Sequence, residues 1–344
     1  MSIVLQKPRA PARGRWLASA VVILAVLGAL VWHDSQDVWS EPGDGRRVLV
    51  KLSLYWALWL VWPLMGWVAL SALRSWRARH VVASAAAVLA FALCACVAWG
   101  RFIEPNTLQV HETTLGTACG VRVALVSDLH LGLYTRQADL QRLIDRLNGL
   151  QVDAVLVAGD WTYEPSYDLR TAFAPLAGLR HRTLSVLGNH DEQKPGPPLK
   201  AELFAALAAA KVESIDGRRL PLGRCELEGL GDLNARSAQH QLKALNTQAS
   251  DVDGAHRVVL THNPDTSFLL APGHASWLLS GHTHGGQINL PILTASLLAR
   301  ATQGGFAQGI YNMKNVHVFV TSGVGIDKLP LRFRVPPTID VLGL

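Results

Sequence analysis

The order of hydrophobic and polar positions divides the chain into two parts. Three long apolar runs, at residues 16–32, 48–73 and 81–100, fill the first part. Each run is long enough, or nearly so, to cross about 30 Å of hydrocarbon as a helix. From residue 121 onward, short runs rich in β-branched residues alternate with helical patterns, which is typical of α/β architecture. The sequence therefore predicts about three transmembrane helices over residues 1–100, followed by one α/β domain.

Composition and charge support this division. The 344 residues carry a formal net charge of +6, and 17% of them are charged, against about 25% in ordinary soluble domains. Residues 1–100 contain ten Lys or Arg and four acidic residues, whereas the rest of the chain has 22 of each. Since the basic residues flank apolar runs, the excess charge indicates a membrane bilayer rather than nucleic acid.

The distribution of basic residues predicts an orientation. The N-terminal tail holds four Lys or Arg and the loop at 74–80 holds three, whereas the loop at 34–47 holds two alongside four acids. The positive-inside rule then places the tail and the second loop in the cytoplasm. We expect a multi-pass protein of the cytoplasmic (inner) membrane with an extracytoplasmic α/β domain; the cytoplasmic face stays open, because one span fewer or more reverses the result. A cleaved signal peptide is the alternative for the first run, but no convincing cleavage site follows it.

Five predicted strands each lead into a loop that carries a metal-competent side chain. The loops lie at 127–130, 159–160, 188–191, 261–264 and 281–286. In α/β sheets, ligands bind at the carboxyl ends of strands. Asp128 and His130, two positions apart at a strand end, project the same way and can share one ion. A set of Asp, Asn and His side chains does not suit one tetrahedral zinc ion, but it suits two divalent cations that share a carboxylate, which favours phosphoryl chemistry.

These loops resemble the ordered motifs of the calcineurin-like metallophosphoesterase superfamily: Asp-x-His, Gly-Asp, Gly-Asn-His-Asp, a lone His, and Gly-His-x-His. The resemblance covers about residues 118–344, and the segment 322–337 is similar to that of membrane-associated bacterial phosphodiesterases and transmembrane proteins with a metallophosphoesterase domain. It implies an α/β fold, a layered α-β-β-α sandwich of two mixed sheets, with residues 101–117 as linker and first strand. Family members often have a second Asp shortly after the Gly-Asp pair, whereas Asp160 is followed here by Trp-Thr-Tyr. No role of that later carboxylate is therefore carried over.

The resemblance also implies a role for each motif residue. The first metal would be held by Asp128, His130, Asp160 and His284, and the second by Asp160, Asn189, His262 and His282. His190 would be the catalytic histidine, which protonates the leaving group or steadies the phosphorane, and a metal-bridging hydroxide would be the nucleophile. Titration near neutrality suits that histidine. Oxygen and imidazole ligands without a thiolate suit Mn²⁺, Fe²⁺ or Zn²⁺.

Further residues near these motifs are candidates for support. Asp191 is expected to be either a partner of a ligand histidine or a turn residue. Gly285 is expected to permit close backbone approach, and Gln287 to orient a ligand. Lys328 and Arg332 are expected to be solvated rather than to meet a substrate phosphate.

Together these expectations describe a membrane-anchored, metal-dependent phosphoesterase. Its substrate would contain a phosphodiester or pyrophosphate bond, in a phosphorylated lipid or cell-envelope molecule held in the same bilayer. The resemblance suggests UDP-2,3-diacylglucosamine of lipid A synthesis, which lies at the cytoplasmic face, in conflict with the expected orientation. A nucleotide phosphodiesterase or nuclease is the second hypothesis, weakened by the neutral α/β half. A non-catalytic membrane scaffold or receptor is the third, weakened by intact ligands at every position.

Three features stay undecided at the level of sequence. Cys119 and Cys225 can pair only if the fold brings them together. The apolar segment 291–298 is expected in the core, with insertion into the lipid surface as the alternative hypothesis. Nothing in the pattern indicates the oligomeric state.

Overall fold

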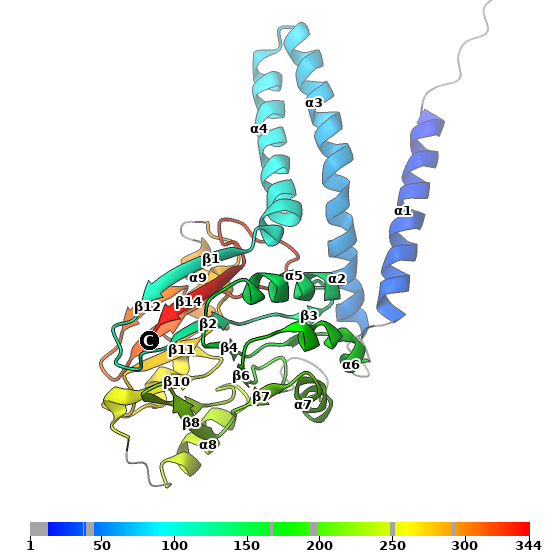
Figure 1. The fold of residues 1–344 in the computed structure, drawn as a ribbon. Coiled ribbons are helices and arrows are strands. Elements are labelled where there is room, and N and C mark those ends of the chain that lie inside the picture. Colours follow the sequence, from blue (N-terminus) through cyan, green and yellow to red (C-terminus); the bar gives the residue numbers. More distant parts are fainter. Residues whose placement is uncertain are drawn as a thin grey trace, which may run out of the picture.

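The computed structural model shows a bundle of long helices standing on one side of an α/β domain (Figure 1). It describes residues 13–36, 38, 45–165, 168–192, 199–247, 252–290 and 293–344. The predicted apolar segment 291–298 falls partly outside these residues.

Three helical rods extend from one side of the domain (Figure 1). Helix α1 (Arg13–Gln36) runs toward the domain, and α4 (Val81–Ala98) returns to it. Between them, α2 (Gly45–Ala57), the turn η1 (Leu58–Leu60) and α3 (Val61–Arg77) lead away from the domain. Each rod contains a helix long and apolar enough to cross a membrane, namely Ser19–Gln36, Gly45–Arg77 and Val81–Asn106. The three predicted membrane helices are thus confirmed as helices of sufficient length and apolarity.

The start of the second rod differs from the prediction, which assigned residues 48–73 to the membrane. Val48 and Leu52 of α2 are buried in a cluster formed largely by the α/β domain. The other buried members of this cluster are Leu133, Tyr134, Tyr163 and Ile326. The first turns of α2 therefore pack against protein, because an apolar pattern is satisfied equally by lipid and by an apolar protein surface.

The domain contains two six-stranded mixed sheets. The first has the order β1 (Gln109–Thr114), β14 (Thr338–Gly343), β2 (Arg122–Val126), β4 (Ala154–Ala158), β6 (Thr183–Val186) and β7 (Val212–Ser214). The second has the order β12 (Gly309–Asn312), β13 (His317–Val320), β11 (Trp277–Ser280), β10 (Arg257–Leu260), β9 (Cys225–Gly229) and β8 (Arg218–Leu222). Strands β2, β4, β6 and β7 are mutually parallel, as are β9, β10, β11 and β13. A short pair, β3 (Leu131–Gly132) and β5 (Thr162–Tyr163), lies beside them.

The two sheets pack face to face around an apolar core. Leu125 and Leu156 of the first sheet belong to one buried cluster with Leu227 and Leu260 of the second. Helices cover the outer faces: α5 (Gln137–Asn148), α6 (Leu169–Ala172) and α7 (Lys200–Ala209) cover the first sheet, and α8 (Ser237–Leu245) covers the second. A further helix, α9 (Leu293–Ala301), follows the loop after β11. The expected layered α-β-β-α sandwich is confirmed.

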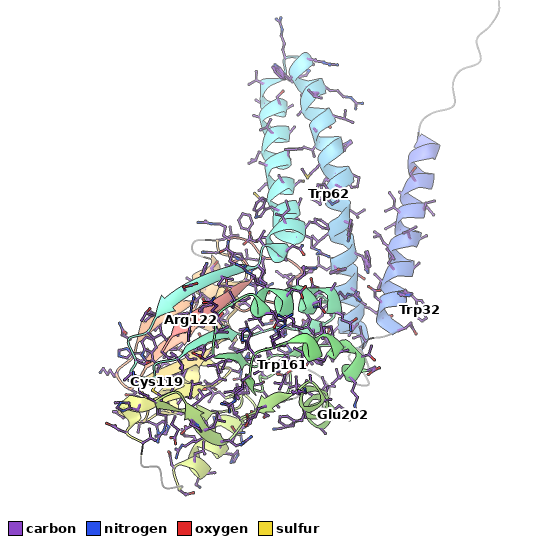
Figure 2. All side chains as sticks on the ribbon, viewed as in Figure 1. Trp32, Trp62, Cys119, Arg122, Trp161 and Glu202 are labelled. Carbon is purple, nitrogen blue, oxygen red and sulfur yellow. A yellow bond between two sulfur atoms is a disulfide. The ribbon has the colours of Figure 1, made fainter. Side chains whose placement is uncertain are left out.

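A disulfide joins the two sheets, a point that the sequence left open. Cys119 lies just before β2 and Cys225 begins β9, and their Cα atoms are 4.9 Å apart. Figure 2 labels Cys119 on the side of the domain that is remote from the helical rods. Cys94 and Cys96, both in α4, are free thiols. The fold therefore brings together two cysteines separated by 106 positions in the chain.

Candidate metal centre

The chemistry-bearing residues gather where parallel strands of both sheets end. The loops after β2, β4, β6, β10 and β11 converge, and they bring together all eight predicted ligand and catalytic residues. These are Asp128, His130, Asp160, Asn189, His190, His262, His282 and His284. All are buried except His282, which is partly exposed. Two sheets packed face to face thus direct five strand ends toward one point.

The backbone at this point adopts conformations that side chains disfavour. Asp128, His130, Asp160, His282 and His284 all have positive φ angles, between 49° and 72°. Non-glycine residues adopt this left-handed region rarely and at an energetic cost, and such residues concentrate at functional sites. Five left-handed residues within one cluster therefore indicate that the loops are shaped by ligand geometry.

Asp128, His130 and His284 form the first group of ligand atoms. Asp128 Oδ1 lies 3.3 Å from His284 Nε2 and 3.8 Å from His130 Nε2. The two imidazole Nε2 atoms are 2.9 Å apart. Asp128 Oδ1 is buried and has no hydrogen-bond partner, and such a group is costly unless something compensates it. A divalent cation fits here, because it satisfies a carboxylate and two imidazole nitrogens at once.

The second group is centred on His262. Its Nε2 lies 3.2 Å from Asp160 Oδ2, 3.2 Å from Asn189 Oδ1 and 3.1 Å from His282 Nδ1. His262 Nδ1 donates to the Ala158 carbonyl at 2.8 Å, which leaves Nε2 free as a ligand. Oxygen and imidazole atoms again converge, so this group also fits a cation.

Asp160 lies between the two groups. Its Oδ2 is 3.2 Å from His262 Nε2 and 3.6 Å from His130 Nε2. Its Oδ1 accepts a hydrogen bond from the His190 backbone at 3.0 Å. This carboxylate therefore lies next to the imidazoles of both groups.

Burial controls the protonation of the imidazoles. It lowers the pKa of His282 to about 4 and that of His284 to about 3. Both rings are therefore neutral at pH 7, as metal ligands must be. His262 differs: although burial opposes it, the neighbouring Asp160 raises the pKa of His262 well above its usual value. Binding of a cation at this group would therefore release a proton.

His190 stands beside both groups. Its ring centroid lies 5.0 Å from the rings of His130 and Tyr163, and its Nδ1 is buried without a hydrogen-bond partner. Burial lowers the pKa of His190 to about 4. The strand-end loops exclude water from the ring, so the imidazole of His190 is neutral at pH 7.

Asp191 supports the ligand loops through their backbone. Its carboxylate accepts hydrogen bonds from the amides of Trp161, Thr162 and Gly188 at 3.0 to 3.1 Å, and from the Thr162 hydroxyl at 3.0 Å. Burial and the nearby Asp160 raise the pKa of Asp191 to about 7, against the effect of these hydrogen bonds. Asp191 thus joins the loops after β4 and β6, and these partners are three backbone amides and the Thr162 hydroxyl rather than a histidine.

Gly285 and Gln287 act on neighbouring chain segments. A Cβ at Gly285 would lie 2.8 Å from the side chains of Gln308 and Val335, so this glycine leaves room for those two side chains. Gln287 donates to the carbonyls of Asp327 and Leu329 and accepts from the Asp327 amide. It holds the loop at 327–329, whereas the sequence led us to expect that it orients a ligand.

The prediction that Arg332 is solvated is wrong. The side chain is fully buried. Its guanidinium donates to the carbonyls of Ser322, Gly323, Gly325 and Val335, and Nη2 lies 3.4 Å from His284 Nδ1. The guanidinium organises the C-terminal segment behind His284, since its fixed array of donors suits several carbonyls at once.

Asp327 is a further residue that the sequence reading missed. Its carboxyl is largely buried, Oδ1 has no hydrogen-bond partner, and Oδ2 lies 2.9 Å from Lys328 Nζ. Although burial opposes it, His130 and Lys328 keep the pKa of Asp327 well below its usual value. Lys328 itself is solvent-exposed, as predicted. The hydrogen bonds between Gln287 and the Asp327 backbone link this residue to the ligand loop after β11, a contact that no local sequence pattern marks.

A layered α/β domain with imidazole and carboxylate ligands at its strand ends defines a metal-dependent phosphoesterase, a class of hydrolase. Residues 121–286 match the family model described as calcineurin-like phosphoesterase. The chain therefore contains a calcineurin-like metallophosphoesterase domain. The family typically binds divalent metals, and the buried ligand cluster suits that property.

Relatives of this chain share the description. The Bacillus subtilis metallophosphoesterase YkuE is 28% identical over 259 residues, which cover 72% of this chain and 88% of that protein. The phosphodiesterase YaeI of Escherichia coli is 26% identical over 287 residues, covering 78% of this chain and 98% of YaeI. A zebrafish (Danio rerio) transmembrane protein with metallophosphoesterase domain is 29% identical over 226 residues, covering 62% of this chain and 50% of that protein. This chain thus spans only half the length of the zebrafish relative. Apolar helices and a relative named as a transmembrane protein together indicate membrane association.

Proposed function

We propose that the protein hydrolyses a phosphodiester or pyrophosphate bond in a membrane-borne or cell-envelope substrate, using two divalent cations. The observation that carries this proposal is Asp160, which lies between two groups of buried ligand atoms. The first cation would be held by Asp128, His130, Asp160 and His284, and the second by Asp160, Asn189, His262 and His282. Paired cations would supply Lewis acidity and lower the pKa of water, and Mn²⁺, Fe²⁺ and Zn²⁺ all suit these ligands.

His190 is the proposed catalytic residue. It is held at the metal centre by its backbone hydrogen bond to Asp160, and Nδ1 is buried without a partner. A neutral imidazole with a free ring nitrogen can exchange a hydrogen bond with an oxygen of the substrate phosphoryl group. Its burial excludes the water that would otherwise weaken such a hydrogen bond.

The helix α2 reaches close to the metal centre, which favours a membrane-borne substrate. Lys51 of α2 forms an ion pair with Glu164, and its Nζ lies 4.5 Å from the centroid of the Tyr163 ring. That ring is 5.0 Å from His190. A cationic side chain from a membrane-type helix therefore lies one aromatic ring away from the catalytic histidine. A bilayer anchor also raises the local concentration of any substrate held in the same membrane.

Two independent features support an extracytoplasmic position for the domain. The arginines at 74, 77 and 79 lie at the end of the helical rods remote from the domain (Figure 1), and such clusters favour the cytoplasmic side. The disulfide between Cys119 and Cys225 is typical of proteins in oxidising compartments. This orientation disfavours UDP-2,3-diacylglucosamine, which lies at the cytoplasmic face.

A substrate panel tests the proposal on the full chain in lipid nanodiscs. The full chain is needed because removal of α2 would expose the apolar cluster of Leu133, Tyr134 and Ile326. With Mn²⁺ we expect hydrolysis of bis(p-nitrophenyl) phosphate, and little hydrolysis of p-nitrophenyl phosphate or plasmid DNA. UDP-2,3-diacylglucosamine is the fourth arm, and EDTA-stripped protein is the blank. Preferred cleavage of DNA would favour the nuclease hypothesis, and inactivity on every arm with two metals bound would favour the scaffold.

A reporter fusion at Leu344 tests the orientation separately. Alkaline phosphatase is active only outside the cytoplasm. Green fluorescent protein fluoresces in the cytoplasm but not after export through the general secretory route. We expect an active phosphatase fusion and a dark fluorescent fusion. The opposite pair of results would place the domain in the cytoplasm and would revive UDP-2,3-diacylglucosamine as a substrate.

A further inference from the structure

A cavity separate from the metal centre lies between the helical rods and the domain. It has a volume of about 240 Å³ and is lined by side chains from α2, from the segment after α4, and from α5. None of the proposed metal ligands lines it. Leu129 and Leu131 contribute to its wall, so it lies behind the loop that carries Asp128 and His130.

Arg101 is the unusual residue of this cavity. It belongs to the π-helical turn η2 (Trp99–Ile103) that follows α4, and it is nine-tenths buried. Its Nε is buried without a hydrogen-bond partner. The guanidinium instead lies over the rings of Tyr55 and Phe102, at 4.1 and 5.0 Å from their centroids. Aromatic contact only partly compensates a buried charge, so the cavity holds a cation whose remaining hydrogen-bonding capacity points to an anionic ligand.

Two further arginines line the same cavity. Arg136 Nη2 is 3.0 Å from Asp34 of α1, and Arg142 Nη2 donates to Asn106 at 2.8 Å. Arg142 also pairs with Asp139, the only acidic residue among those described that line the cavity. Asp34 and Asp139 thus balance two of the three arginines, and the remaining charge of +1 lies on Arg101. Clustered guanidinium groups are the usual protein partners of phosphate, which they bind with two parallel hydrogen bonds.

The rest of the lining is apolar. Leu140, Leu143, Val324 and Ile326 contribute to it, together with the ring of Tyr134. An inorganic anion has no apolar atoms to bury against such a surface, whereas a membrane lipid carries glycerol and acyl carbons next to its phosphate. The combination of basic and apolar lining therefore favours a phospholipid over a free ion.

The cavity also lies at the depth where lipid head groups are expected. Trp59 and Trp62 pack against Phe102, with ring centroids 4.8 and 5.4 Å away. Trp99 begins the turn that carries Arg101 and is 48% exposed. Figure 2 shows Trp62 on the helical rod above the domain. Tryptophans concentrate at the membrane interface, so this group marks the head-group layer next to Arg101.

We propose that the cavity binds the phosphate-bearing head group of an anionic membrane lipid, with Arg101 as its principal contact and Arg136 and Arg142 at its rim. The inference is independent of the proposed reaction, because the site is separate from the metal ligands and its test measures binding. A lipid bound here would fill the junction between α2, the end of α4 and α5.

The test is a lipid titration of the full chain, delipidated in a non-ionic detergent and followed by native mass spectrometry. The ligands are phosphatidylglycerol, phosphatidylcholine, glycerol 3-phosphate and inorganic phosphate. The variants are Arg101→Gln and Arg142→Gln. The matched control is Arg146→Ala, which removes an exposed arginine of the same helix α5 that does not line the cavity.

We expect phosphatidylglycerol to bind about tenfold more tightly than phosphatidylcholine. Each Gln variant should weaken phosphatidylglycerol binding about tenfold, the effect of losing one charge-assisted contact, and Arg146→Ala should bind like the wild type. Arg142→Gln keeps the test decisive if Arg101→Gln fails to fold, because Arg142 is 53% exposed. Equal binding of both lipids, or unchanged binding in Arg142→Gln, would overturn the proposal. Tight binding of glycerol 3-phosphate or inorganic phosphate alone would overturn the lipid as the source of the anion.

Discussion

At the scale of the residue, the metal centre is distinguished by polar groups that lack the partners they need. Asp128 Oδ1 and His190 Nδ1 are both buried without a hydrogen-bond partner. The neighbouring Asp191 carboxylate, in contrast, is satisfied by four hydrogen bonds. Unsatisfied buried groups in a native fold require an explanation, and a cation-binding site provides one.

Arg332 offers a prediction at this scale. The Arg332→Gln substitution should weaken metal binding about 10- to 100-fold, which is the usual effect of removing a group that positions a metal ligand. The reason is that the segment behind His284 loses the guanidinium that donates hydrogen bonds to its carbonyls. Metal content after dialysis against a chelator series measures this. The matched control is Arg334→Gln, an exposed arginine two positions away, which should retain wild-type affinity. Equal affinity in both variants would show that Arg332 has no positioning role.

Asp340 gives a prediction about pH. Burial raises the pKa of this β14 residue to about 6 from its usual value of 3.8. The folded state therefore binds the extra proton, so its contribution to stability is complete below pH 4 and is lost as the pH rises through 6. Asp340→Asn removes the cost of ionisation, which is about 3 kcal/mol.

The measurement is the thermal unfolding midpoint of Asp340→Asn relative to wild type at pH 4 and at pH 8. We expect a small difference at pH 4 and a clearly higher midpoint for the variant at pH 8. His111 Nδ1 lies 4.0 Å from Asp340 Oδ1. The same difference at both values of pH would mean that Asp340 ionises in the folded protein without cost.

At the scale of the element, the positions of strands were easier to predict than the surroundings of helices. Short apolar runs that lead into loops with Asp or His correctly located β2, β4, β6, β10 and β11. Helix α2 was predicted as part of a membrane span, yet its first turns pack on the domain. Hydrophobic pattern reports that a face is buried, and the third dimension decides whether lipid or protein buries it.

The contact between α2 and the domain is testable. Leu52 is fully buried, whereas Leu54 on the same helix is 38% exposed. Leu52→Ala should lower the stability of the full chain by about 2 to 5 kcal/mol, because it leaves a cavity in a packed cluster. Leu54→Ala is the control and should have a much smaller effect. Unfolding in nanodiscs followed by tryptophan fluorescence distinguishes the two, and equal effects would mean that α2 does not pack on the domain.

The C-terminal segment was the hardest element to predict. Its position near the metal centre depends on long-range hydrogen bonds: the Gly325 amide donates to the Asp128 carbonyl, and the Arg332 amide donates to the carbonyl of Gly100 in η2. No periodicity marks such a segment, since its partners are backbone groups far away in the sequence. The ligand motifs, in contrast, carry their chemistry in adjacent residues and could be found directly.

At the scale of the whole molecule, charge and disulfide bonding both bear on the side of the membrane where the domain lies. The sequence predicted an extracytoplasmic domain from the distribution of Lys and Arg, and the pairing of Cys119 with Cys225 depended on the packing of two sheets. A link across 106 residues is expected to stabilise the fold by about 2 to 5 kcal/mol. In a Cys94→Ser/Cys96→Ser background, which removes the free thiols of α4, the remaining two cysteines should resist maleimide labelling in intact cells.

Reduction gives the contrasting result. After treatment with dithiothreitol in denaturant, both cysteines should label with polyethylene glycol maleimide and shift the band on a gel. Labelling of both cysteines in cells before reduction would show that the disulfide does not form, and it would remove one of the two arguments for an oxidising compartment.

The most direct test of the central claim is the rate of bis(p-nitrophenyl) phosphate hydrolysis as Mn²⁺ is added to the EDTA-stripped full chain in nanodiscs. The variant is Asp160→Asn, which alters the carboxylate between the two ligand groups. Its matched control is Asp145→Asn, an exposed aspartate on α5. We predict that activity appears with about two Mn²⁺ bound per chain, is unchanged in Asp145→Asn, and falls at least roughly hundredfold in Asp160→Asn. Hydrolysis at the wild-type rate by Asp160→Asn, or without added metal, would contradict the account.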